Sequence, residues 1–167
     1  MLIDDIAAEY VLPGILAEEL KERAYTLLVA GYDNPNLAAL VGATKDQAPA
    51  DLRDLFLRAL RDLGVPLPDE LSAGQRLKRR YAQMVVDREL APAEGAWKIV
   101  ALFHRLEGQL PENVRCVGDG FGVGHLVGAY YSYDDVEGDE TAVREIDEEI
   151  VLLGERIARG EEANPPE

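Results

Sequence analysis

The chain has 167 residues, 47% of them hydrophobic, with 32 acidic and 17 basic side chains and a net charge of −15 at neutral pH. A chain of this size buries about two-thirds of its unfolded surface and needs no structural metal, and its single cysteine excludes an internal disulfide and fits a reducing compartment. The longest apolar run, residues 121–131, is too short to span a bilayer. The first five residues contain two acids and no base, whereas a signal peptide begins with basic residues, so we expect a soluble, cytoplasmic, globular protein.

Three helices are predicted in the first third of the chain. Between residues 16 and 28, apolar side chains recur with the period of an amphipathic helix, which ends before Gly31. Pro35 suits the first position of a short helix over residues 35–41. A third helix, over residues 49–63, also begins at a proline and carries one apolar stripe.

Two longer helices are predicted next. Asp69 is placed to cap a helix that runs to about Leu90, and Pro92 begins another that covers residues 93–106. The second of these is apolar on nearly all sides around Trp97, which is typical of a helix against which others pack. We therefore predict a buried Trp97 at the centre of the fold and a loss of about 3–5 kcal/mol in Trp97→Ala.

The last predicted helix spans about residues 139–158. Its apolar residues are spaced by 3, 4, 3 and 4 positions: Val143, Ile146, Ile150, Leu153 and Ile157. Such a stripe usually faces the core of its own domain, which is the favoured interpretation, while the a/d spacing leaves a homodimer through this helix open. The acidic tail, residues 160–167, is predicted to be disordered, which leaves a single domain over residues 1–159.

The segment 112–128 is rich in glycine and is predicted to be irregular. It contains neither a GxGxxG frame nor the lysine and hydroxyl residue of a P-loop, which argues against nucleotide binding. Its glycines suit close packing or positive φ angles, and a short hairpin around Asp119-Gly120 is an alternative. Because no strand alternation precedes this segment, we predict an all-α fold, a compact bundle of about six helices.

Cys116, His125 and His104 are, with Asp119, the residues from which a thiol nucleophile or a soft-metal site can be built. Nucleophilic catalysis needs a base within reach of the thiol, and zinc needs ligands at paired spacings that the sequence lacks. We predict no catalytic residue, no metal and no cofactor, with a buried inert cysteine and a hydrogen-bonded core His104. The alternative is a small-molecule-binding or hydrolytic domain with a pocket near these three residues.

The negative charge is concentrated near the C-terminus, where residues 134–167 contain 13 acidic and 3 basic side chains, a net charge of −10. This charge repels nucleic acid and acidic membranes, so neither is an expected partner, and it attracts basic proteins. Solubility alone is the other explanation of the charge. The acidic run from Asp134 to Glu140 does not fit an EF-hand.

One basic cluster stands out against this charge. It consists of Arg76, Lys78, Arg79 and Arg80, and it lies on the predicted helix that begins at Asp69. We expect it to pair with the acidic C-terminal helix, although exposed ion pairs contribute only about 0–1 kcal/mol each.

Three tyrosines, Tyr130, Tyr131 and Tyr133, directly precede the acidic run. Tyrosine is enriched in the hot spots of protein interfaces, so these tyrosines with Asp134, Asp135 and Glu137 form the predicted partner-binding surface. Equally, two of the tyrosines can close the core beneath the last helix. We predict a non-enzymatic protein-binding module of immunity or regulatory type that binds a basic protein partner through this surface.

The stretch Gly31-Tyr32-Asp33-Asn34-Pro35 resembles the signature of a family of small all-helical bacterial proteins. The segment from Pro92 to Trp97 and the Tyr-Ser-Tyr-Asp-Asp stretch ending at Asp135 fit the same order of elements. The resemblance covers roughly residues 24–135 and implies an all-helical fold, while the glycine-rich segment and the last helix depart from it. That family has no established activity, so no residue role carries over, and a partner-binding or immunity-type role is an analogy of architecture.

Overall fold

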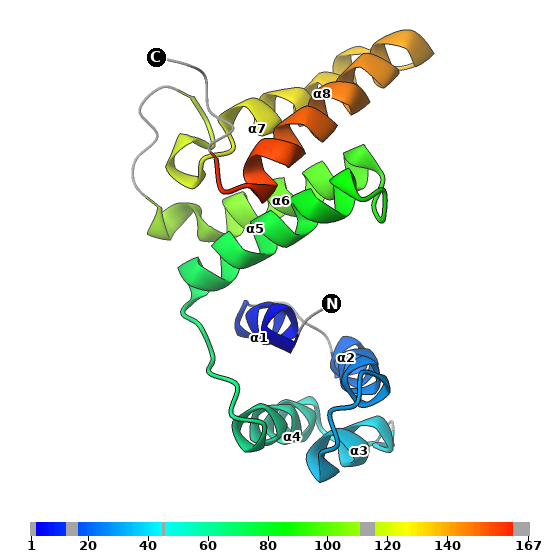
Figure 1. Ribbon diagram of the computed structural model, residues 1–167, viewed down its shortest axis with the longest axis vertical. Helices are drawn as coiled ribbons and strands as arrows, with labels where there is room; N and C mark the ends of the chain where they lie inside the picture. Colours follow the sequence, from blue (N-terminus) through cyan, green and yellow to red (C-terminus); the bar gives the residue numbers. More distant parts are fainter. Residues whose placement is uncertain (1–2, 13–16, 45, 111–115, 162–167) are drawn as a thin grey trace. The chain divides into compact units, whose positions relative to one another are not determined.

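The computed structural model describes residues 3–12, 17–44, 46–110 and 116–161 (Figure 1). These residues form eight α-helices and three short 3₁₀ turns, with no strand among them. The predicted all-α class is confirmed, with eight helices in place of about six. The chain forms two compact units, Met1–Ala73 and Gly74–Glu167. A single domain over residues 1–159 stays a prediction, and most of the predicted disordered tail lies outside the described residues.

The first unit has one apolar core shared by four helices: α1 (Ile3–Val11), α2 (Ala17–Val29), α3 (Pro35–Val41) and α4 (Pro49–Asp62). Each helix contributes a side chain that is at most 1% exposed, among them Ile6, Leu27, Leu40 and Phe56. The bounds of α2, α3 and α4 agree with the predicted ones to within one residue. The sequence did not predict α1, because its apolar face is only about two turns long.

The connection between α2 and α3 is a set of turn and cap positions. Gly31, with a φ of +91°, ends α2 in the left-handed conformation that glycine adopts readily. The Asn34 side chain caps α3 by accepting a hydrogen bond from the Asn36 amide at 2.8 Å. The Asn36 side chain donates to Asp62, at the end of α4, also at 2.8 Å. The motif that carries the family resemblance therefore has a structural role here.

The second unit contains most of α5 (Glu70–Val86) together with three further helices and three turns. These are α6 (Pro92–Leu106), η1 (Glu107–Gln109), η2 (Asp119–Phe121), α7 (Gly124–Tyr131), η3 (Ser132–Asp135) and α8 (Glu140–Ala158). Helices α6, α7 and α8 pack against one another, and α5 approaches α6 at Gly95 and α8 at Gly154 (Figure 1).

Helix α5 begins as predicted and ends earlier than predicted. The Asp69 carboxylate accepts a hydrogen bond from the Ser72 amide at 2.8 Å, as expected of a cap. The helix ends at Val86, and not near Leu90, because Arg88 adopts a φ of +61°. An arginine in this left-handed region is uncommon, so no residue type in the sequence marks the stop.

The predicted irregular segment over residues 112–128 is only partly irregular. Residues 112–115 lie outside the described residues, and residues 116–123 contain the single turn η2 without the alternative hairpin. Gly118 and Gly122, on either side of η2, have φ angles of +95° and +72°, so they turn the chain where other residues would be strained.

The last part of the segment predicted to be irregular, residues 124–128, belongs to helix α7. Residues 124–131 are helical in spite of two glycines, and Leu126, Val127 and Ala129 are buried. The helix packs against both α6 and α8. This packing outweighs the low helix propensity of glycine, about 1 kcal/mol below that of alanine.

Helix α6 packs against both α7 and α8 in the second unit, as expected of a helix with several apolar sides, but Trp97 is not among its buried residues. Seven α6 residues are buried: Gly95, Ala96, Ile99, Val100, Leu102, Phe103 and Leu106. Trp97 is 52% exposed, so the prediction of a buried tryptophan is wrong. Glu94, one turn before it, and His104, two turns after it, are also exposed, so Trp97 lies on the solvent-facing side of α6.

The apolar stripe of α8 packs within its own unit. Ile146, Ile150, Leu153 and Ile157 are between 1% and 8% exposed, and α8 contacts both α6 and α7. The favoured interpretation of this stripe is confirmed. A homodimer through α8 stays a prediction, and this buried stripe is not available to it.

The α5–α6 contact predicts opposite effects of one substitution at two glycines. A Cβ on Gly95 would lie 2.0 Å from Cγ2 of Val85, whose β-branched side chain has one preferred rotamer in a helix. We expect Gly95→Ala to lower the free energy of unfolding by about 1–3 kcal/mol. At Gly128 no atom lies within 4 Å of the added Cβ, so Gly128→Ala should raise it by about 0.5–1 kcal/mol. Denaturant unfolding measures both, and a stabilised Gly95→Ala would contradict the close contact.

Candidate functional site

Four aromatic side chains of the second unit form a contiguous cluster, which we call the aromatic cluster: Trp97, Tyr130, Tyr131 and Tyr133. The ring of Tyr130 is central, with its centroid 6.0 Å from Trp97, 5.3 Å from Tyr131 and 6.4 Å from Tyr133. Trp97 and Tyr131 are 52% and 47% exposed, whereas Tyr130 and Tyr133 are partly buried. The cluster therefore both covers the core and faces solvent. Tyr130 and Tyr133 fit the interpretation in which two tyrosines close the core, while the partner-binding surface stays a prediction.

Polar contacts hold two of these rings in place. The Tyr131 hydroxyl lies 3.1 Å from Nε2 of His104, and the Tyr133 hydroxyl donates a hydrogen bond to Asp147 of α8. His104 is exposed, so its prediction as a core histidine is wrong, although it does make a hydrogen bond. Rings fixed by such contacts lose little conformational freedom when another molecule packs on them.

The predicted acidic residues lie immediately beside this cluster. Asp134 and Asp135 belong to η3, as Tyr133 does, and Glu137 follows in the connection to α8. All three are exposed, and none of them forms an ion pair or hydrogen bond with another residue of the described chain. We call these three residues the acidic segment. Their charges are therefore available to a cation from outside.

Two further carboxylates of this region have structural roles. Asp139 caps α8 by accepting from the amides of Thr141 and Ala142 at 3.0 and 3.1 Å. Asp147 accepts the Tyr133 hydroxyl. Burial raises the pKa of Tyr133 above its ordinary value of 10, and the hydrogen bond and negative charge of Asp147 raise this pKa further.

The basic cluster on α5 is only partly placed as predicted. Arg80 pairs with Glu89 at 2.9 Å, and not with the C-terminal helix. Lys78 is buried and donates from Nζ to the carbonyl of Phe121 at 2.6 Å. Arg79 forms no ion pair with any described residue. The expected pairing with acidic side chains of α8 is therefore wrong for Arg79 and Arg80.

Cys116 and His125 line the same open pocket of about 350 Å³, together with Glu149 of α8, whereas His104 is not part of it. The Cys116 thiol donates to Oδ1 of Asp119 at 2.9 Å. A negative carboxylate in this position opposes formation of the thiolate, the nucleophilic form of cysteine. His125 forms no hydrogen bond with the thiol in the described chain. The pocket has room for a small molecule, and among the described residues the thiol donates to Asp119 and not to His125. The alternative function stays a prediction.

Neither a group of metal ligands nor a membrane-spanning helix occurs among the described residues. No three His, Cys, Asp or Glu side chains there are grouped so that they could hold a metal ion. None of the described helices combines the length and the apolar character needed to cross a bilayer.

The chain matches no family model, no curated protein and no solved structure. The resemblance around Gly31 therefore has no matching family model behind it. The aromatic cluster and the acidic segment are themselves the ground for a functional proposal.

The Tyr133–Asp147 contact predicts a pH dependence of stability. Because the folded state raises the pKa of Tyr133 above 10, this group's contribution to stability is complete below pH 10 and is lost as the pH rises from there toward the folded pKa. We expect the free energy of unfolding to fall more steeply above pH 10 in the wild type than in Tyr133→Phe. Tyr25→Phe, at a residue that is 61% exposed, should keep the wild-type slope. Parallel curves for the wild type and Tyr133→Phe would contradict the assignment.

Proposed function

We propose that the protein is a non-enzymatic, cytoplasmic binding module of immunity or regulatory type, whose ligand is a basic protein. The observation that carries the proposal is the position of two exposed aromatic rings, Trp97 and Tyr131, beside three carboxylates that have no partner among the described residues. The rings offer apolar area and the carboxylates offer charge, a combination suited to lysine-rich and arginine-rich surfaces.

The two parts of the surface have different physical tasks. The acidic segment attracts a positively charged partner over a distance and raises the association rate. The aromatic cluster makes the short-range contacts that keep the partner bound, because tryptophan and tyrosine carry much of the binding energy of protein interfaces. Charge should therefore control association, and the rings should control dissociation.

Solubility explains an acidic surface but does not explain exposed aromatic rings. A surface that serves only solubility avoids exposed tryptophan, since each exposed ring favours unwanted association. Trp97 and Tyr131 are each about half exposed, and both contact Tyr130. This exposure is why we favour a docking surface over a merely solvated face.

The first test reverses the charge of the acidic segment. A tagged protein is incubated with native lysate, and the basic protein retained at low salt and released at high salt is identified by mass spectrometry and purified. The test variant replaces all three residues of the acidic segment by lysine: Asp134→Lys, Asp135→Lys and Glu137→Lys. With the purified partner, this variant should associate about tenfold or more slowly at low salt, and its association rate should depend less on salt.

The control makes the same change in net charge elsewhere. Glu18, Glu22 and Asp46 are exposed acids of the first unit, and their combined replacement by lysine should alter association far less. Equal slowing by both triple variants would assign the effect to net charge and contradict a local surface. A lysate in which no protein is retained at either salt would contradict the proposal as a whole.

The second test removes the exposed rings. Trp97→Ala and Tyr131→Ala should each speed dissociation by about tenfold or more while leaving association nearly unchanged. Because Trp97 is only half buried, its removal should lower the free energy of unfolding by about 1–2 kcal/mol, less than the loss predicted for a buried ring. The matched control is Tyr25→Ala, which removes an exposed tyrosine of the first unit. Unchanged dissociation in both ring variants would show that the partner binds elsewhere.

A further inference from the structure

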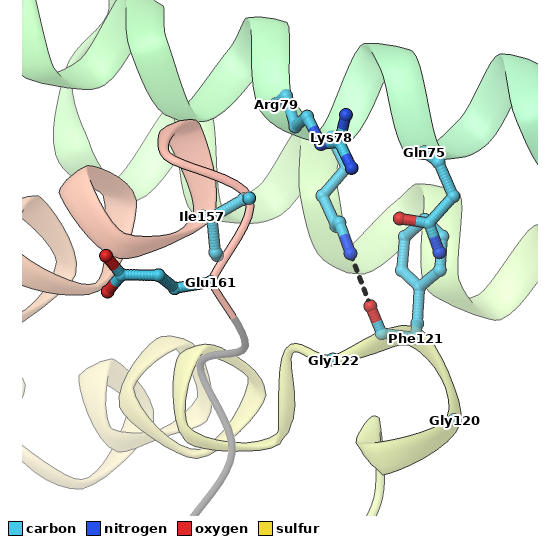
Figure 2. A pocket seen from close by; sticks show the side chains of 9 residues that line it. Gln75, Lys78, Arg79, Gly120, Phe121, Gly122, Ile157 and Glu161 are labelled. Atoms are coloured by element: carbon cyan, nitrogen blue, oxygen red, sulfur yellow. Dashed lines mark hydrogen bonds between the residues drawn. The ribbon is translucent and has the colours of Figure 1, made fainter.

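The second unit contains another cavity, with no residue in common with the aromatic cluster or the acidic segment (Figure 2). Its volume is about 200 Å³, and it is bordered by α5, by the loop through η2 and by the end of α8. Its polar side chains are Gln75, Lys78 and Arg79 of α5 and Glu161 after α8. Two of these are cations, in a chain whose net charge is −15.

Lys78 places a fixed positive charge in the wall of this cavity. Its side chain is buried, with 8% of the residue exposed. Nζ donates to the Phe121 carbonyl at 2.6 Å, shown as the dashed line in Figure 2, and lies 4.6 Å from the centre of the Phe121 ring. These contacts hold the ammonium group at one position, and a buried charge is screened less by salt than an exposed one.

Arg79 and Gln75 add hydrogen-bond donors. Both side chains line the cavity, and neither forms a hydrogen bond or ion pair with another described residue. A guanidinium group presents a planar set of N–H donors that matches the oxygens of a carboxylate or phosphate group. The Gln75 amide supplies a further N–H donor without adding charge.

The acid that borders the cavity is already compensated. Glu161 accepts from Nε of Arg159 at 2.9 Å and lies 3.9 Å from Nε of Arg156. In Figure 2 its carboxylate points away from Lys78. Arg159 also lies 3.8 Å from Glu155, so Glu161 belongs to a network of ion pairs at the end of α8.

The end of α8 is shaped so that it leaves room for Arg79. Gly160 has a φ of +80°, and a Cβ at this position would lie 3.8 Å from a terminal nitrogen of Arg79. The amides of Gly160 and Glu161 donate to the carbonyls of Ile157 and Arg156, each at 2.9 Å. These bonds occupy carbonyls whose negative ends would otherwise oppose an anion at a helix C-terminus.

We propose that this cavity binds a small oxyanion, a phosphate or carboxylate group, held by the Arg79 guanidinium and the Gln75 amide. The Lys78 ammonium lies in the wall beside them, fixed by its own contacts with Phe121. The volume of the cavity limits the buried part of the ligand to one such group with few further atoms. The site is independent of the proposed partner-binding surface, so either one can fail without the other.

Titration of the full chain with three salts tests the site. Sodium phosphate, sodium succinate and sodium chloride are added at matched ionic strength near 0.15 M, and the amide signals of Gly120, Gly122 and Gly160 are followed by nuclear magnetic resonance. We expect saturable shifts with one of the two oxyanions, with a dissociation constant on the order of 1 mM, and none with chloride. Tighter phosphate binding identifies a phosphate-bearing ligand, and tighter succinate binding identifies a carboxylate. No saturation with either oxyanion overturns the proposal.

Two arginine variants distinguish binding in the cavity from non-specific attraction of the anion to positive charge elsewhere on the protein. Arg79→Gln should weaken oxyanion binding about tenfold, as the loss of one charge-assisted contact implies. Because Arg79 is exposed, an unchanged thermal midpoint should show that this variant is folded. Arg105→Gln, at an exposed arginine of α6 that does not line the cavity, should bind as the wild type does. Equal weakening by both variants, or no weakening by Arg79→Gln, overturns the assignment.

Discussion

Burial of one apolar stripe of α8 determines which groups the C-terminal part of the chain presents to solvent. With that stripe turned toward α6 and α7, the exposed positions of the helix include Glu145, Glu148 and Glu149. The same docking brings Asp147 to the Tyr133 hydroxyl and so ties the aromatic cluster to α8. Each fully buried aliphatic side chain contributes about 1.5–3 kcal/mol, whereas an exposed charge interaction is worth about 0–1 kcal/mol. Packing therefore outweighs the repulsion among the acids of this helix.

The fold was predictable wherever a residue type marks the end of a helix. Pro35, Pro49 and Pro92 mark the starts of α3, α4 and α6 to within one residue, because proline has a fixed φ and needs no helical donor at that position. The early end of α5 was not predictable, since it depends on Arg88 adopting a conformation usual for glycine. Helix α7 was missed for a related reason: packing against α6 and α8 stabilises a glycine-containing helix that local propensity disfavours.

The candidate surface was predictable only where its residues are neighbours in sequence. The three tyrosines and the acidic segment lie within eight consecutive positions, residues 130–137, so adjacency alone brought them together. Trp97 was missed because the helix around it is apolar on most sides; the available signals were the polar residues Glu94 and His104, three positions before and seven positions after it on the same side of α6. Cys116 and His125 do line one pocket, but the hydrogen bond from the thiol to Asp119 depends on the turn at η2, which the sequence did not predict.

The two proposed sites lie at opposite ends of α8, which separates their electrostatics. Acidic residues occupy its first turn and the preceding segment, while Arg156 and Arg159 lie at its end, an order that the helix dipole favours. The acidic segment precedes the start of α8, and the aromatic cluster meets the helix at Asp147, which is ten residues or about 15 Å before Ile157 at the cavity. This distance is about twice the screening length of about 8 Å at physiological ionic strength. The acidic end therefore exerts little repulsion on an anion in the cavity, and the arginines exert little repulsion on a basic partner. One helix in an acidic protein can in this way serve ligands of opposite charge at the same time.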